Sequence, residues 1–135
     1  MSSESDEVDY KLTNLMSLCI NCENITPKMI NEMKDEIGLQ DIFDNTALIY
    51  LCSNNKNITP DLIRALKDEI GIQNSFGKSA LISYCVYNEI IKPEIIRELK
   101  DEIGMKSMNN TTALMELYKR NYPLTPEIIK EFKHF

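Results

Sequence analysis

The chain repeats itself every 33 residues, and this period limits the possible folds more than any other feature. Prolines stand at positions 27, 60, 93 and 126, and each belongs to a similar segment, such as ITPDLIRALKDEIGIQ. Asp-Glu-Ile-Gly recurs at the same interval from Asp35, Asp68 and Asp101. A short unit cannot bury its own apolar face, so units that recur at a constant period must stack against one another.

Each unit predicts two helices and a short connector. The first helix begins at a Thr or Ser suited to an N-cap, as in Thr46-Ala47-Leu48-Ile49. The second has Thr59 as its N-cap, Pro60 where no N–H is needed, and Gly71 as a stop signal. The connector IQNSFGK contains turn-forming Asn, Ser and Gly. We therefore expect an all-α fold, an elongated helical-repeat solenoid of four stacked helix-turn-helix units.

Charge and composition divide the chain into an acidic tail, residues 1–9, and a repeat domain with units 10–42, 43–75, 76–108 and 109–135. The formal net charge is −6, and the tail contains no Lys or Arg. Because no basic face is present, nucleic acid is not an expected partner. No window is apolar enough for a membrane span, and the first residues lack a secretory signal. We expect a cytoplasmic or nuclear protein with reduced thiols.

The period, the turn before Thr-Ala-Leu, the apolar second helix and the Gly at its end resemble the ankyrin repeat, which has Thr-Pro-Leu at the matching place. The resemblance covers residues 10–135 and implies a concave face, made of first helices and connectors, that binds other proteins. A tetratricopeptide array is the competing assignment, but its period is 34 and its proline ends the second helix.

The chain departs from the ankyrin pattern in two ways. The loop between helices, as at 54–58, is longer and the segment after the Gly is shorter, so we expect the family's hairpin fingers to be reduced to plain turns. Ile49 and Ile82 replace the His that often follows Thr-Pro-Leu.

The pair Cys19-Ile20-Asn21-Cys22 has the spacing of a redox motif or half of a zinc site. Cys19, Cys52 and Cys85 are, however, 33 residues apart, which indicates one buried position in three units. Cys22 aligns instead with asparagines of the later units. We therefore expect the spacing to be a packing cysteine with an accidental neighbour.

The recurrent Lys-Asp-Glu, as at Lys67-Asp68-Glu69, has two interpretations. It predicts either a solvated helix face, which we favour, or a charged track for a partner or a divalent ion. The only histidine is His134, no Gly-rich phosphate loop is present, and no Ser or Cys is paired with a base. We therefore expect no enzyme, cofactor, metal or small-molecule substrate.

Positions that change between units indicate recognition, because packing requires the same residue in every unit. Such positions form three rows along the expected exposed side of the first helices; one row holds Tyr50, Ser83 and Glu116. Aromatic residues in the connectors are second-rank candidates, since an aromatic that recurs is more often a packing residue. The candidate partner-binding residues are Tyr50, Tyr87, Ser53, Asn54, Val86, Glu116, Lys119, Arg120, Phe43 and Phe76.

The leading hypothesis is a non-enzymatic protein-protein interaction module. The alternatives are a structural subunit of a larger assembly, cytoskeletal or ribonucleoprotein, and a protein inhibitor of an enzyme. The last unit keeps Ile128, Ile129 and Phe132 at core positions, and Phe135 is expected to be exposed at that end, where a partner could dock.

Substitution of Cys19 and Cys22 distinguishes a packing role from a redox or zinc-binding role. We expect Cys19→Ala to lower the free energy of unfolding by about 1 kcal/mol or more, because it removes a packed core atom. Cys22→Asn, which installs the residue of the later units, should leave it unchanged. Urea denaturation measures both, and stoichiometric zinc binding by the wild-type chain would contradict the interpretation.

Overall fold

The computed structural model describes residues 11–133, and within them the chain is all-helical, with no strand. The expected all-α class is therefore confirmed. The tail at residues 1–9, His134 and the expected exposure of Phe135 lie outside the described residues. The helices are α1 (Asn14–Asn21), α2 (Pro27–Asn31), α3 (Ala47–Asn54), α4 (Pro60–Ala65), α5 (Ala80–Tyr87), α6 (Pro93–Glu98), α7 (Ala113–Lys119) and α8 (Pro126–Phe132), with 3-10 turns η2 (Lys34–Glu36), η3 (Lys67–Glu69) and η4 (Lys100–Glu102).

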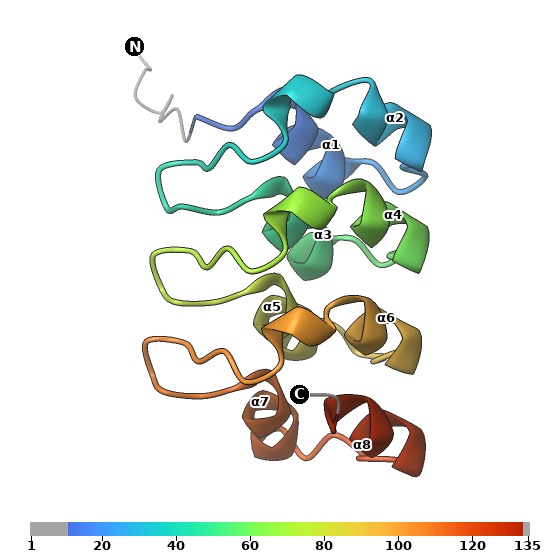
Figure 1. Cartoon of the computed structure of the whole chain (residues 1–135), viewed down its shortest axis with the longest axis vertical. Helices are drawn as coiled ribbons and strands as arrows, with labels where there is room; N and C mark the ends of the chain where they lie inside the picture. The colour runs from blue at the N-terminus through green and yellow to red at the C-terminus, as the bar shows by residue number, and fades with distance from the viewer. Residues whose placement is uncertain (1–10, 134–135) are drawn as a thin grey trace.

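The helices form two neighbouring columns, one of first helices and one of second helices (Figure 1). In the first column α3 packs between α1 and α5, and α5 packs on α7. In the second column α2, α4, α6 and α8 follow in the same order. One hydrophobic core runs through the stack and includes Leu15, Leu48, Leu81 and Leu117, one from each first helix.

The helix starts follow the predicted capping chemistry. Thr46 Oγ1 accepts a hydrogen bond from Ile49 N at 3.1 Å, and Thr59 Oγ1 accepts one from Leu62 N at 3.3 Å. The third unit differs, because Lys92 stands at the N-cap of α6 and makes no side-chain cap. In place of a side-chain cap, the backbone carbonyl of Lys92 accepts from Ile95 N at 3.0 Å.

The second helices are shorter than the sequence suggests. We expected a helix up to Gly71, but α4 ends at Ala65, Leu66 has φ −111° and ψ 24°, and η3 follows. Gly71 then has φ +99°, a conformation in which a Cβ atom would be strained. The interruption turns Glu69 toward the first helix of its own unit.

The glutamates of the Lys-Asp-Glu segments hold neighbouring units together. Glu69 Oε1 accepts from Leu48 N in the first turn of α3 at 2.8 Å, and its Oε2 accepts from Gly38 N of the preceding unit at 2.7 Å. Glu102 accepts in the same way from Leu81 N and Gly71 N, both at 2.7 Å. A carboxylate is stable at a helix N-terminus, where the free N–H groups point toward it.

Both carboxylates are buried, so the expectation of a solvated face is wrong for Glu69 and Glu102. Lys67 and Asp68 are exposed, as expected. Burial raises the pKa of the Glu102 carboxyl, and the backbone N–H donors and Ser79 oppose this increase. Burial likewise raises the pKa of Glu69 against the effect of its two backbone donors.

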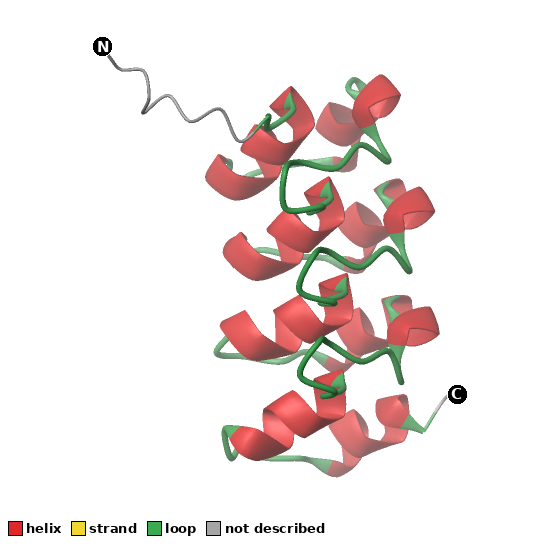
Figure 2. Cartoon of the chain, turned by 90° about the vertical axis from the view of Figure 1, so that its left-hand side faces the viewer, coloured by secondary structure: helices red, strands yellow, loops and turns green. Residues whose placement is uncertain are grey.

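The connectors project as three fingers on one side of the stack (Figure 1), and this side faces the viewer in Figure 2. The fingers are residues 39–45, 72–78 and 105–111. Within the second finger Asn74 N donates to Lys78 O at 3.0 Å, and Asn74 Oδ1 accepts from Phe76 N and Lys78 N, both at 2.9 Å. Gly77 has φ +76°, and a Cβ atom there would lie 2.7 Å from Met108 N of the next finger. The expected plain turns are therefore closely stacked loops, and none of the three fingers contains a strand.

Backbone hydrogen bonds join each finger to the next. Ser75 N donates to Phe43 O, and Met108 N donates to Phe76 O, both at 2.9 Å. These bonds run between neighbouring fingers in the direction of the stack. They fix the positions of the side chains that the fingers carry.

The cysteines lie where the repeat places them. Cys19, Cys52 and Cys85 are fully buried, and Cys22 is half-buried. Burial, with smaller contributions from Glu69 and Cys22, raises the pKa of the Cys19 thiol to about 12. A reactive cysteine needs a lowered pKa, so Cys19 has the properties of a packing residue.

We expect Lys92→Thr to raise the free energy of unfolding by about 1 kcal/mol, since the new hydroxyl could accept from Ile95 N as the other capping threonines do from their own helices. The reverse change, Thr59→Lys, should cost a similar amount. Thermal and urea denaturation measure both. Equal stability of Lys92→Thr and the wild type would show that the third cap is already satisfied.

We expect Glu102→Gln to lower the free energy of unfolding by about 2 kcal/mol, because the amide NH2 would face a backbone donor. Since the pKa of Glu102 is raised in the folded state, that state takes up the proton first as pH falls. The wild type should therefore gain stability over Glu102→Gln from neutral pH down to the ordinary glutamate pKa of 4.5.

Urea denaturation at a series of pH values tests this dependence. Asp101→Asn, an exposed change on the same turn, is the control and should track the wild type. A difference between wild type and Glu102→Gln that shrinks with falling pH would mean that the pKa of Glu102 is lowered.

Candidate partner-binding surface

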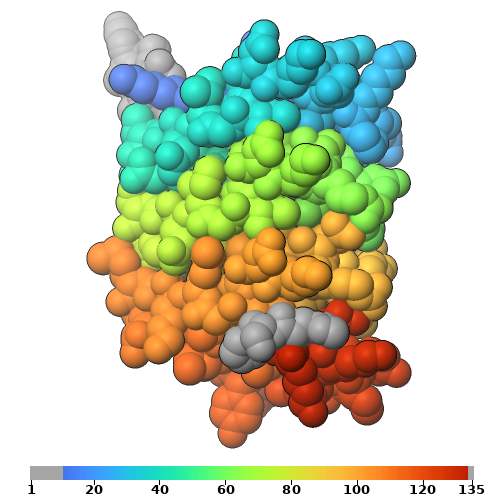
Figure 3. Space-filling view, viewed as in Figure 1, coloured from blue at the N-terminus to red at the C-terminus, as the bar shows by residue number. Residues whose placement is uncertain are grey.

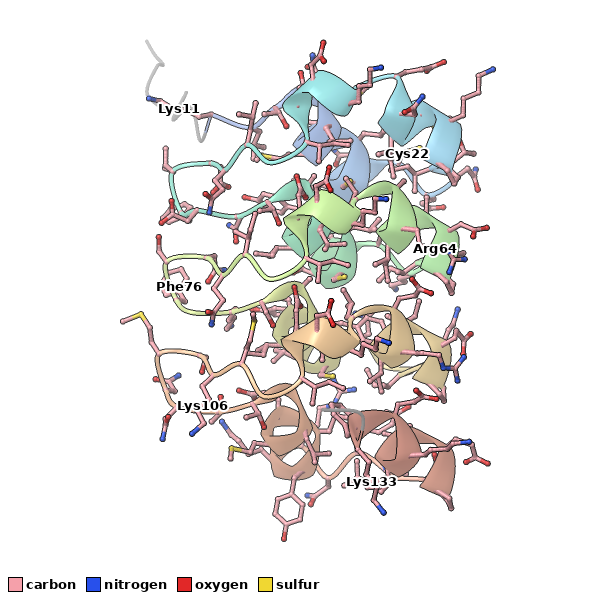
Figure 4. The ribbon with its side chains drawn as sticks, in the orientation of Figure 1. Lys11, Cys22, Arg64, Phe76, Lys106 and Lys133 are labelled. Carbon is pink, nitrogen blue, oxygen red and sulfur yellow. The ribbon has the colours of Figure 1, made fainter. Side chains whose placement is uncertain are left out.

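The fingers display aromatic rings that the stack holds in order. Phe43 and Phe76 lie on successive fingers with their ring centroids 6.5 Å apart and an interplanar angle of 25°. Phe76 is 55% exposed. Figure 4 shows Phe76 and Lys106 on the finger side of the molecule, opposite Arg64 on the second helices. The sequence predicted packing for these rings, and the structure shows packing on each other with substantial exposure.

A groove of about 400 Å³ lies between the fingers and the first helices of the last two units. We call it the finger groove. It brings together four of the predicted residues, which come from a finger, from α5 and from α7. It is lined by Phe76, Lys78, Val86, Ser107, Met108, Asn109, Glu116 and Lys119.

The charged side chains of the finger groove form hydrogen bonds and an ion pair with neighbouring side chains. Glu116 accepts from Thr111 Oγ1 at 2.7 Å and lies 3.8 Å from Lys119 Nζ. Lys78 Nζ donates to Tyr87 OH at 3.3 Å and lies 5.3 Å from the centroid of that ring. Two lysines therefore face one glutamate, and the groove is positive although the chain is negative overall.

Tyr87 lines a second groove of about 400 Å³, which we call the loop groove. The loop groove lies between the helix-helix loops of the second and third units, and Lys78 and Tyr87 connect it to the finger groove. Tyr84 holds one of these loops in place, since its OH accepts a hydrogen bond from Lys92 N at 2.8 Å. The loop groove is lined by Lys56, Ile58, Tyr84, Tyr87, Asn88, Glu89, Ile90 and Lys92.

Other predicted residues make contacts within the chain. Tyr50 OH donates to Asp41 Oδ2, and Ser53 Oγ donates to Ile49 O at 2.7 Å. Asn54 is exposed but lies away from both grooves, beside the loops of the first two units.

Arg120 stabilises the end of α5. Its guanidinium donates to Val86 O at 3.1 Å and to Asn88 O, and lies 5.0 Å from the centroid of the Tyr122 ring. Ser83 was expected on the exposed side of its helix, but it is buried, because α5 is covered on more sides than the row suggested.

Sequence reasoning missed Lys78, Met108 and Ile90, which line the two grooves. Met108 is 73% exposed, and it aligns with Ile42 and Ser75. The criterion of variation between units, applied to all connector positions, would have found it.

The described part of the chain offers little for other kinds of site. Between residues 11 and 133 no group of three or more His, Cys, Asp or Glu side chains is arranged to hold a metal ion. No helix in that range has the length and apolar character to cross a membrane. Comparison with protein-family models and with curated proteins gives no match.

Proposed function

We propose that the chain is an ankyrin-like repeat solenoid and a non-enzymatic module that binds another protein through the finger groove. The observation that carries this proposal is the convergence of the exposed Phe76 and Met108, on fingers joined by backbone hydrogen bonds, with Lys78 and with Lys119 of α7. The exposed Tyr87 of α5 adjoins them through its contact with Lys78. Aromatic and methionine side chains in a concave site are typical of the centres of protein interfaces.

The rigidity of the surface favours binding. The second finger is tied to the first by Ser75 N and to the third by Phe76 O, so its side chains are positioned before a partner arrives. A preorganised surface loses little conformational entropy on association. The constant 33-residue period and the stacked helix pairs support the ankyrin-like assignment.

The chemistry of the finger groove favours a partner segment with an apolar anchor beside an acidic residue. Phe76, Val86 and Met108 supply apolar contact, and Lys78 and Lys119 supply positive charge at the edge. Exposed lysines steer an acidic partner and make the association rate dependent on salt.

The test is affinity capture with the immobilised chain from cytoplasmic extract, followed by titration calorimetry with the purified partner. We expect the double variant Phe76→Ser, Tyr87→Ala to weaken binding by about 100-fold, as loss of interface hot spots does. The control is Ile42→Ser, which removes an apolar side chain that is 47% exposed and lies outside both grooves.

Binding that survives the double variant, or that is lost equally in the control, would contradict the finger groove as the site. A partner enzyme that loses activity in the complex would assign an inhibitory role. Recovery only with a large particle would assign a structural role. Raising the salt concentration should slow association of the wild type more than that of Lys78→Ala, Lys119→Ala.

A further inference from the structure

The last unit exposes side chains that the other units bury. Met115 is 45% exposed and Tyr118 is 75% exposed, whereas Ile82 and Cys85, at the same positions one unit earlier, are fully buried. Figure 3 shows the units as successive bands, so that each end of the stack belongs to one unit. Terminal repeats that stay apart from other chains usually carry a polar outer face. This C-terminal end is apolar instead.

The first unit exposes the complementary side of the repeat. Leu18, Met29 and Met33 are half-buried, while their counterparts in the second unit, which are covered by the first, are buried. The two ends therefore display opposite halves of the interface that joins neighbouring units within the chain.

The hydrogen bond between units is also missing at the N-terminal end. Glu69 and Glu102 each accept from a glycine N–H of the preceding unit at 2.7 Å. In the first unit Glu36 Oε1 accepts from Leu15 N at 2.7 Å, and its Oε2 receives no donor among residues 11–133. The first unit therefore lacks the hydrogen bond that a preceding unit would supply.

Ion pairs between the second helices also join neighbouring units, and the residues at the two ends of the stack have the matching charges. Arg64 and Glu98 are 2.6 Å apart, and Arg97 and Glu131 are 2.5 Å apart, each pair joining two successive units. Lys130 occupies the arginine position in the last unit, and Glu32 occupies the glutamate position in the first. The charges at the two ends are therefore opposite and in register.

We propose that the chain associates with a second copy of itself, head to tail, with the first unit of one copy stacked on the last unit of the other. Lys130 of one copy would pair with Glu32 of the next, and Tyr118 and Met115 would be covered. A contact between two different ends does not close on itself, so it yields an open series of species unless the copies form a ring.

Sedimentation velocity of the full chain over about a thousandfold range of concentration tests the proposal. The expected result is a weight-average mass that increases continuously with concentration. Tyr118→Asp should weaken association by about tenfold or more, because it places a charge in the apolar end. Its thermal stability should equal that of the wild type, since Tyr118 is already exposed in the monomer.

Charge exchange tests the direction of stacking. Lys130→Glu and Glu32→Lys should each weaken association by about fivefold, as an exposed ion pair permits, and a mixture of the two variants should restore it. Lys133→Glu, on the same terminal segment, and Tyr87→Asp, on the concave side, are controls that should associate like the wild type.

A chain that remains monomeric throughout the concentration range would overturn the proposal. A discrete dimer that Glu32→Lys leaves unchanged would also overturn it, because that result indicates contact between two identical ends. The loss of partner binding in the Phe76→Ser, Tyr87→Ala variant does not bear on these outcomes, so the two proposals fail independently.

Discussion

The buried carboxylates of Glu69 and Glu102 make the contacts on which the geometry of the stack depends. A single carboxylate satisfies a first-turn N–H of its own unit and the glycine N–H of the unit before it, as Glu69 does for Leu48 and Gly38. Apolar packing alone is non-directional and would allow neighbouring helix pairs to slide. Two hydrogen bonds to one buried carboxylate are directional, so they fix the position of one unit relative to the next. This contact recurs 33 residues apart, at Glu69 and Glu102, and so favours a constant period.

The shape of the proposed binding surface depends on the same contact. Because Gly71 is held by Glu102, the finger that begins after it leaves the stack in a fixed direction. The fingers then meet closely enough for Met108 N to reach Phe76 O, and a side chain at Gly77 would prevent this approach. The shape of the finger groove therefore depends on contacts between units, such as those of Gly71 and Gly77. The side chains that line the groove vary between units, because packing does not require a particular residue there.

The sequence predicted the helical class, the helix starts and the buried cysteines, because local signals determine them. Thr46 and Thr59 cap the helices that follow them, and the alignment of Cys19 with Cys52 indicates burial without any structure. The end of the second helix was wrong, since the interruption at Leu66 depends on bonds that Glu69 makes to residues 21 and 31 positions away. No local pattern contains that information.

The site was predicted in part for the same reason. Val86, Glu116, Lys119 and Phe76 were identified because they vary between units, and the finger groove brings them together. Arg120 varies as well, but its guanidinium is bound to the carbonyls that end α5. Variation shows that packing does not require a residue type, and it does not show where the side chain points.

The two proposed surfaces are compatible and would strengthen one another. The finger groove lies on the side of the stack, and the self-association contact lies at its ends, so occupation of one leaves the other free. If copies stack head to tail, each copy adds one finger groove to a continuous row. A partner with two or more acidic, apolar segments would then bind several copies at a high effective concentration, and its avidity would exceed the affinity of any single groove. Weak self-association, of the strength that one unit interface provides, could thus be stabilised by the partner, because ligands that bind the assembled state shift the equilibrium toward it.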